Sequence, residues 1–326
     1  MRLDVIIPTY NRQPMLERTL RSLLAATVPS GMEAQVTVVD NNSKDRTRQF
    51  VESQMELFGG RLRYVFEHKQ GRSHALNAGI AATDGDLVGM IDDDEEIETG
   101  WYVRIHRAFL ENGIDFIGGP YVPRWGAECP VWFPASYKGV VGWVDSGDEV
   151  RSFDENFEGM LMGGNAVLRR SILARVGPYS TSLGRTDKHL LSCEDDDMYQ
   201  RLRAAGARGL YLPDLIIYHY IPPERLTKRY FRRWCFWHGV SQGMLDRERR
   251  SAVAYFGGVP RWLYGRAARG ALATAKELPK RNKDAARIFA NELALWDLAG
   301  FFYGKHLYRP QRGRTETREI CEGAEV

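Results

Sequence analysis

Hydrophobic residues in the first 120 positions form two alternating kinds of segment. Short runs rich in β-branched residues have the composition of buried strands, and they fall at 3–8, 34–40, 62–66, 86–91 and 115–119. Between these runs, apolar residues recur at the three- and four-residue spacing of helices, along 14–26, 50–58, 75–82 and 101–109. Strands that alternate with helices in this way predict an α/β fold of parallel βαβ units, with helices on both faces of the sheet.

The pattern changes after residue 119. Residues 121–134 are rich in aromatic side chains and proline, which predicts loops or short strands, and residues 163–177 predict a strand followed by a short helix. Residues 194–206 predict a helix, because four acids fall in its first turn and a glycine ends it. We therefore expect one domain with two halves and a mainly helical C-terminal extension, with bounds at 1–118, 119–223 and 224–326.

Composition narrows the class of protein. The chain has 326 residues, of which 44% are hydrophobic, enough to bury a substantial core. The four cysteines form no C-x-x-C pair, so we expect neither a disulfide framework nor a zinc site, and a reducing compartment such as the cytoplasm fits better. No secretory signal and no run of about 18 apolar residues is apparent, so we predict no membrane-spanning helix.

The net charge of +3 is unevenly distributed along the chain. Residues 1–223 carry 24 Lys and Arg against 31 Asp and Glu, whereas residues 224–326 carry 21 against 11. Within the basic part, 225–240 interleaves Arg and Lys with Tyr, Phe and Trp. This segment suits either an interfacial helix on anionic lipid headgroups or a helix that closes the domain. We expect no nucleic-acid binding, because no recognisable module is present and the first part is acidic.

Polar residues follow three of the predicted strands. They are Pro8–Asn11, Asp40–Asn42 and Asp92–Asp94, and ligands of parallel sheets bind beyond the carboxyl ends of the strands. Adjacent carboxylates repel one another, and without a cation at least one tends to protonate. The acids at 92–94 therefore indicate a hard divalent metal bound through oxygen, the alternative being a solvated acidic turn.

Two later features extend this pattern. A second acidic cluster, Glu194–Asp197, opens the predicted helix at 194–206, and His219 lies in the apolar frame IIYHY. Taken alone, such a histidine is more often a packed core residue than a ligand. Together, the features suggest a metal site and a separate base.

The ordered set of motifs resembles the family-two inverting glycosyltransferases of the GT-A fold. The matching segments cover roughly residues 3–223, and they are IIPTYNR (6–12), VVDNNSKD (38–45), GRSHALNAGIAATDGDLVGMIDDDEE (71–96), GGNAVLRRSIL (163–173), CEDDDMYQRLRAAG (193–206) and His219. The resemblance implies a Rossmann-like, mostly parallel sheet flanked by helices. It also implies a hexosyltransferase-type enzyme that moves a sugar from a nucleotide sugar to a saccharide or lipid-linked saccharide, as in polysaccharide or cell-envelope glycan synthesis.

The resemblance assigns the donor to residues 1–118. The donor loop is matched by Pro8, Thr9, Tyr10 and Asn11. Asp40 matches the acid that accepts a hydrogen bond from a uracil ring, which favours a UDP-sugar.

Further donor and metal contacts follow from the same resemblance. Arg72 and Asn77 fall in the stretch that lines the nucleotide, although Arg72 also fits a surface charge at a helix start. Asp92 and Asp94 match the D-x-D pair that binds Mn²⁺ or Mg²⁺, with Asp93 also at the donor. His219 matches a third metal contact.

The resemblance assigns the acceptor and the chemistry to residues 119–223. Asp195 matches the catalytic base and Glu194 orients the acceptor. Gly164 and Asn165 let the backbone approach a sugar. Trp132 either stacks on a sugar ring or packs under a loop.

The resemblance also suggests that Arg225 and Arg229 could contact the diphosphate, because relatives often have a basic residue shortly after the histidine. Two other interpretations remain open: a degenerate GT-A domain that binds sugar nucleotides as a scaffold, and a glycoside hydrolase built on paired carboxylates.

Overall fold

The β-branched runs of the sequence form the central sheet of the protein. The computed structural model describes residues 1–110, 113–185, 189–250 and 252–309. The sheet has the strand order β3-β2-β1-β4-β9-β6-β10-β8. Its strands are β1 (Arg2–Thr9), β2 (Glu33–Asp40), β3 (Leu62–Phe66), β4 (Leu87–Met90), β6 (Phe116–Gly118), β8 (Arg151–Ser152), β9 (Ala166–Arg169) and β10 (Gly209–Tyr211). The pairs formed by β1 to β4 are parallel, as expected, whereas β9 runs antiparallel to both β4 and β6.

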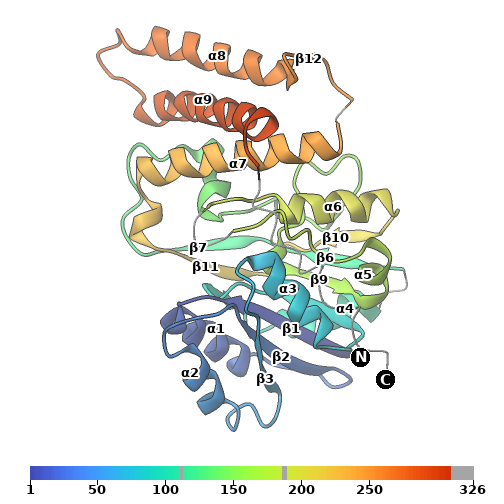
Figure 1. Cartoon of the computed structure of the whole chain (residues 1–326). Coiled ribbons are helices and arrows are strands. Elements are labelled where there is room, and N and C mark those ends of the chain that lie inside the picture. Colours follow the sequence, from blue (N-terminus) through green and yellow to red (C-terminus); the bar gives the residue numbers. More distant parts are fainter. Residues whose placement is uncertain (111–112, 186–188, 251, 310–326) are drawn as a thin grey trace, which may run out of the picture.

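Helices cover both faces of this sheet (Figure 1), because successive residues of a strand point to opposite sides. In β1, Val5 and Ile7 pack in one core with α1 and α4, and Ile6 packs in a second core with α3, α5 and α6. The helices are α1 (Gln13–Ala25), α2 (Thr47–Gln54), α3 (Arg72–Ala81), α4 (Trp101–Leu110), α5 (Arg170–Val176) and α6 (Glu194–Ala204). The α/β fold predicted from the sequence is confirmed.

A small second sheet brings a late segment of the chain beside the acidic run. It consists of β5 (Glu95–Ile97), β11 (Ile217–Ile221) and β7 (Tyr121–Trp125), with β11 in the middle. His219 is the register partner of Glu95 on one side and of Pro123 on the other. The strand pairing therefore holds His219 next to the acids that follow β4.

Three helices of the C-terminal part stack beside the sheet domain (Figure 1). They are α7 (Lys228–Glu248), α8 (Arg261–Glu277) and α9 (Ala285–His306), with a short hairpin of β12 (Tyr255–Phe256) and β13 (Val259–Pro260) before α8. Gly239 and Gly243 on α7 face Gly300 and Gly304 on α9, and a Cβ atom at any of these glycines would collide with the main chain of the other helix. The two helices therefore pack backbone to backbone.

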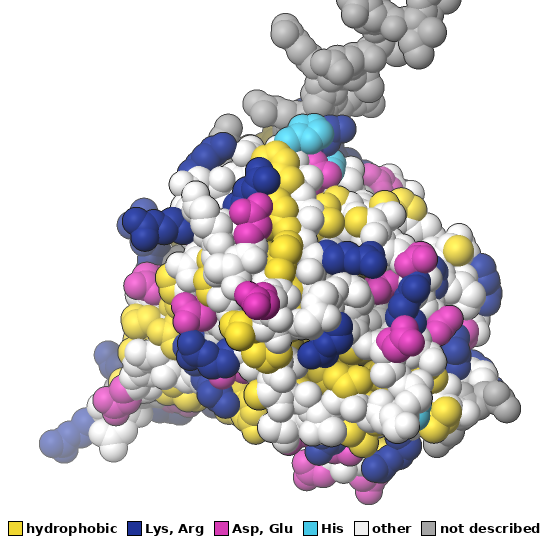
Figure 2. All heavy atoms as spheres, turned by 90° about the horizontal axis from the view of Figure 1, so that it is seen from below, with side chains coloured by type: hydrophobic (Ala, Val, Ile, Leu, Met, Phe, Trp, Pro, Cys, Tyr) yellow, Lys and Arg dark blue, Asp and Glu magenta, His cyan; other side chains and the backbone are white. Residues whose placement is uncertain are grey.

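The surface of the N-terminal half, at the bottom of Figure 1, shows basic and acidic side chains interspersed (Figure 2). Among the described residues, no broad patch of one sign is visible on this face. In the described part of the chain, every helix is too short or too polar to cross a bilayer.

Candidate functional site

A cavity of about 630 Å³ lies at the carboxyl ends of β1 and β4, where ligands of such sheets bind. Two elements from later in the chain also reach it, namely the start of α6 and strand β11. Its lining includes Pro8, Thr9, Tyr10, Arg12, Arg72, Asp92, Asp93, Asp94, Glu95, Tyr121, Gly164, Arg185, Cys193, Glu194, Asp195, Asp196, His219, Arg225, Trp234 and His238. The two acidic clusters of the sequence, about a hundred residues apart, thus share one cavity.

The acids after β4 are held by arginines. Arg12 donates hydrogen bonds to Asp93 Oδ1 at 2.6 Å and to Asp94 Oδ2 at 2.7 Å, and Arg225 donates to Asp94 Oδ2 at 3.0 Å. Burial raises the pKa of Asp93 to about 7 in spite of Arg12. Burial acts in the same direction on Asp94, but the charges of Arg12 and Arg225 outweigh it and hold the pKa of Asp94 well below its usual range.

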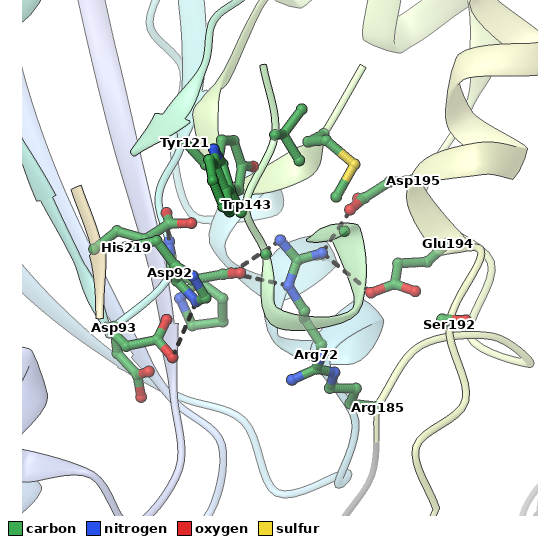
Figure 3. A pocket seen from close by; sticks show the side chains of 18 of the residues that line it. Arg72, Asp92, Asp93, Tyr121, Trp143, Arg185, Ser192, Glu194, Asp195 and His219 are labelled. Atoms are coloured by element: carbon green, nitrogen blue, oxygen red, sulfur yellow. Dashed lines mark hydrogen bonds and ion pairs between the residues drawn. The ribbon is translucent and has the colours of Figure 1, made fainter. Parts of the chain in front are cut away.

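Arg72, the first residue of α3, joins the two acidic clusters. Figure 3 shows its guanidinium between Asp92 on one side and Glu194 and Asp195 on the other. Its Nε lies 2.9 Å from Asp92 Oδ1, and its Nη1 lies 3.3 Å from Glu194 Oε1 and 3.2 Å from Asp195 Oδ1. Burial, together with the neighbouring Asp195 charge, raises the pKa of Glu194 to about 7. Arg72 therefore contributes positive charge to both clusters, in addition to the Arg12 and Arg225 charges at the first one.

The surroundings of His219 fit a metal ligand. Its Nε2 lies 3.6 Å from Asp94 Oδ2 and 3.1 Å from Nη1 of Arg225, and both His219 and Asp94 are buried. Its buried Nδ1 has no hydrogen-bond partner among the described residues. With the proton on Nδ1, the lone pair of Nε2 points toward Asp94. A cation between these two atoms would have one nitrogen and one carboxylate ligand, a donor set that suits Mn²⁺.

A family model described as "Glycosyl transferase family 2" matches residues 4–177, more than half of the chain. The chain belongs to this family. The succinoglycan biosynthesis protein ExoM of Rhizobium meliloti (strain 1021) is 26% identical over 253 residues, which cover 76% of each chain. The glucosyl-dolichyl phosphate glucuronosyltransferase of Haloferax volcanii is 29% identical over 253 residues, which cover 76% of this chain and 78% of that protein.

The fold is similar to that of the mannosyltransferase PcManGT from Pyrobaculum calidifontis, solved in complex with GDP-Man and Mn²⁺. The TM-score is 0.59 at 19% sequence identity, and the match covers 93% of this chain and 86% of that one. The GT-A fold expected from the motifs is thus confirmed, and the chain is a glycosyltransferase. Membership in this family excludes the glycoside hydrolase interpretation.

Several predicted donor residues of this glycosyltransferase support the cavity from outside its lining. Asp40 is buried, and its two oxygens accept hydrogen bonds from the Ser43 amide and the Tyr64 hydroxyl, both at 2.8 Å. Asn11 accepts from the Lys44 amide at 2.6 Å. Asn11 therefore holds the loop after β1 against the loop after β2, whereas Asp40 joins the loop after β2 to β3. Each Asp40 oxygen still has lone-pair capacity for a further donor.

Asn77 and Asn165 join separate segments of the glycosyltransferase. Asn77 exchanges two hydrogen bonds with the backbone of Tyr179, at 2.9 and 2.8 Å. Asn165 is fully buried, donates to Leu215 O at 2.6 Å and accepts from Trp101 Nε1 at 3.0 Å. Neither side chain is part of the cavity lining in the described structure.

Trp132 packs away from the cavity. Its ring lies edge-on against Phe231 at 5.6 Å and Phe289 at 5.1 Å between centroids. It belongs to the hydrophobic cluster in which residues of α7 and α9 pack against Val140, Val141 and Ile221. Of the two interpretations left open by the sequence, the contacts favour packing over sugar stacking.

Two glycines set the positions of acids. A Cβ atom at Gly163 would collide with the carboxylate of Asp195, and one at Gly164 would collide with that of Glu95. Gly164 lines the cavity, and its absent side chain leaves room for Glu95. Glu95 is buried, accepts a hydrogen bond from the Asp92 amide at 2.7 Å, and has a pKa raised well above its usual range by burial and by Asp92.

The sequence analysis missed other residues that line the cavity. Arg12 is the last residue of the matching segment IIPTYNR (6–12), so its place beyond a strand end was a usable signal. Tyr121 and Arg185 had no such signal, because each comes from a segment without a recognised motif. Trp234 lies in the basic and aromatic segment 225–240, which the sequence analysis assigned to a membrane surface or to closing the domain.

Proposed function

We propose that this glycosyltransferase moves a sugar from a nucleoside diphosphate sugar to a hydroxyl group of a saccharide or lipid-linked saccharide, with inversion at the anomeric carbon and with Mn²⁺ or Mg²⁺. The observation that carries the proposal is the buried Arg72 bridge from Asp92 to Glu194 and Asp195. It supports the use of both acidic clusters in one reaction, one at the departing diphosphate and the other at the incoming alcohol.

Residues 1–118 form the donor half in this proposal. Asp92, Asp94 and His219 would hold the divalent ion, which when bound stabilises the charge that develops on the departing diphosphate. Arg12 and Arg225 now share the Asp94 carboxylate, and they would turn to the phosphate oxygens once a cation takes that carboxylate. The free lone pairs of Asp40 support a hydrogen bond to a uracil ring N–H, so UDP is the expected nucleotide.

Residues 119–223 form the acceptor half. Asp195 would take the proton of the attacking hydroxyl as general base. Arg72 now holds the Asp195 carboxylate, and a diphosphate that draws Arg72 away would leave that oxygen free for the acceptor. Glu194, whose pKa burial raises to about 7, would donate or accept a hydrogen bond to orient the acceptor.

A contact of the extension with a membrane surface belongs to the same proposal. Arg229 and Arg233 are exposed at the start of α7, and together with Arg232, Trp237 and Trp296 they line an apolar cavity of about 310 Å³. Cationic side chains beside aromatic rings suit the anionic inner face of a membrane. The protein should float with liposomes that contain anionic lipid at low salt but not at high salt. An Arg229→Glu/Arg233→Glu variant should not float with the liposomes at either salt concentration. Equal flotation of both proteins would reject the contact.

Calorimetry and transfer assays test the proposal directly. UDP should bind only in the presence of Mn²⁺ or Mg²⁺, and more tightly than GDP. Asp94→Asn should lose the metal-dependent binding. Asp195→Asn should keep it while transfer falls by at least about 10²-fold.

Glu248→Gln, a change at an exposed acid on α7, serves as the matched control. Full transfer by Asp195→Asn would overturn the assignment of the base. Retention of the anomeric configuration in the product would overturn the proposed inversion.

A further inference from the structure

A second set of metal-binding side chains lines the cavity, separate from the acids that follow β4. Cys193, Asp196 and His238 each present a ligand atom, and these three atoms lie within 4.8 Å of one another. Cys193 directly precedes α6, Asp196 is in its first turn, and His238 lies on α7. The group therefore connects the start of the acidic helix to the C-terminal extension.

The His238 side chain approaches the other two side chains without bonding to either of them. In the described structure, no hydrogen bond or ion pair joins His238 to Cys193 or Asp196. Zinc bonds of about 2.0–2.3 Å place neighbouring ligand atoms of a tetrahedral site roughly 3.3–3.8 Å apart. A contraction of about 1 Å, within reach of side-chain rotations, would close the group around one ion.

The environment of His238 is that of a zinc-binding histidine. Its Nδ1 lies 3.0 Å from Oδ1 of the buried Asp297, whose other oxygen lies 3.2 Å from Arg266 Nη1. An ionised carboxylate can only accept, so Nδ1 carries a proton, and the neutral imidazole that binds a metal has its lone pair on Nε2. An outer carboxylate of this kind fixes the tautomer and orientation of metal-binding histidines. Trp234 stacks on the imidazole at 4.9 Å and further fixes the ring plane.

The environment of Cys193 is equally specific. Its backbone has φ of 73°, a left-handed conformation that is uncommon for a residue other than glycine. Gln242 Nε2 donates to Cys193 Sγ at 3.4 Å and to Asp196 Oδ2 at 3.3 Å, so one amide orients both ligands. Burial raises the pKa of the Cys193 thiol well above its usual range. A bound cation would reverse this effect and deprotonate the thiol.

We propose that Cys193, Asp196 and His238 form a binding site for a thiophilic divalent cation, with zinc as the best chemical match and an open fourth position toward the cavity. Sulfur and imidazole ligands distinguish this site from the carboxylate-rich site at Asp94, which suits Mn²⁺ or Mg²⁺. The ion would fasten the start of α6, which carries Asp195, to α7.

Cobalt titration of the full chain after removal of metal tests the proposal. Co²⁺ should produce a thiolate-to-cobalt absorption band in the near ultraviolet at one equivalent, and Zn²⁺ should abolish the band by competition. Cys193→Ser and His238→Gln should each lose the band, whereas Cys129→Ser, a change at an exposed cysteine, should keep it. Asp94→Asn should also keep it, which makes this result independent of the proposed catalytic metal.

Asp297→Asn should weaken zinc binding by about 10–100-fold, because the outer carboxylate is lost. The absence of a band in the unmodified protein, or a band that persists in Cys193→Ser, would overturn the proposal. If Cys193→Ser does not fold, as judged by circular dichroism, the His238→Gln and Asp297→Asn titrations decide the question by the same criterion.

Discussion

Arg72→Gln is the most direct perturbation of the site, because a single guanidinium neutralises acids from two separate segments. It lies 2.9 Å from Asp92, 3.3 Å from Glu194 and 3.2 Å from Asp195. Glutamine keeps a hydrogen-bond donor at this position but removes the charge. The carboxylates would then repel one another in a mostly buried cavity without their shared cation.

The expected loss of stability follows from the burial of this group. Removal of one partner from a buried ion pair costs about 3–5 kcal/mol. The Arg72 side chain is 13% exposed and its partners line a cavity open to solvent, which favours the lower end of that range. We expect the free energy of unfolding to fall by about 3 kcal/mol and the melting temperature to fall by roughly 5–10 °C.

The loss should depend on pH. The pKa of Glu194 is about 7 in the folded protein and about 4.3 in the unfolded chain. The folded state therefore holds this proton more tightly, and the resulting stabilisation is present below about pH 4.3 and is lost as the pH rises through about 7. Without Arg72 the ionised form of Glu194 is still less favourable. The difference between variant and unmodified protein should therefore grow from about pH 5 to about pH 8.

Urea unfolding of both proteins at the two pH values measures this difference. Arg48→Gln is the matched control, because Arg48 pairs with Glu52 on the surface with 68% of its side chain exposed, and the loss of such an exposed pair should leave the free energy of unfolding nearly unchanged. A loss for Arg72→Gln that equals the control, or that is the same at both pH values, would refute the reasoning.

Three further predictions concern particular contacts. Gly163→Ala should displace Asp195, because the new Cβ atom collides with the Asp195 carboxylate. The kcat of transfer should therefore fall, while the UDP affinity measured by calorimetry stays unchanged. An unchanged kcat would contradict this prediction. Trp132→Ala should lower the free energy of unfolding by about 2–3 kcal/mol and leave the KM for the acceptor unchanged, whereas a raised KM in a stable variant would restore the stacking role. Gly300→Ala should lower the melting temperature, because the new Cβ atom collides with the Phe236 backbone. Gly265→Ala on α8 should leave the melting temperature unchanged, because its Cβ atom meets only the end of the Arg269 side chain.

Local patterns predicted much of the fold and part of the candidate site. The runs at 3–8 and 86–91 became β1 and β4, and the acids that follow β4 line the cavity, because a residue after a strand lies at the edge of the sheet. The antiparallel direction of β9 was not predicted. Strand periodicity is the same in both directions, so it cannot report direction.

The sequence by itself determined the order of strands and helices, the carboxylates at the strand ends and the membership in a glycosyltransferase family, because each depends on residues close together in the chain. Only the tertiary structure decided that Arg72 stands between Asp92 and Asp195, that Trp132 packs on Phe231, and that His238 approaches Cys193. These contacts join residues many positions apart. Their separation is set by the packing of helices on sheets, which no local periodicity records.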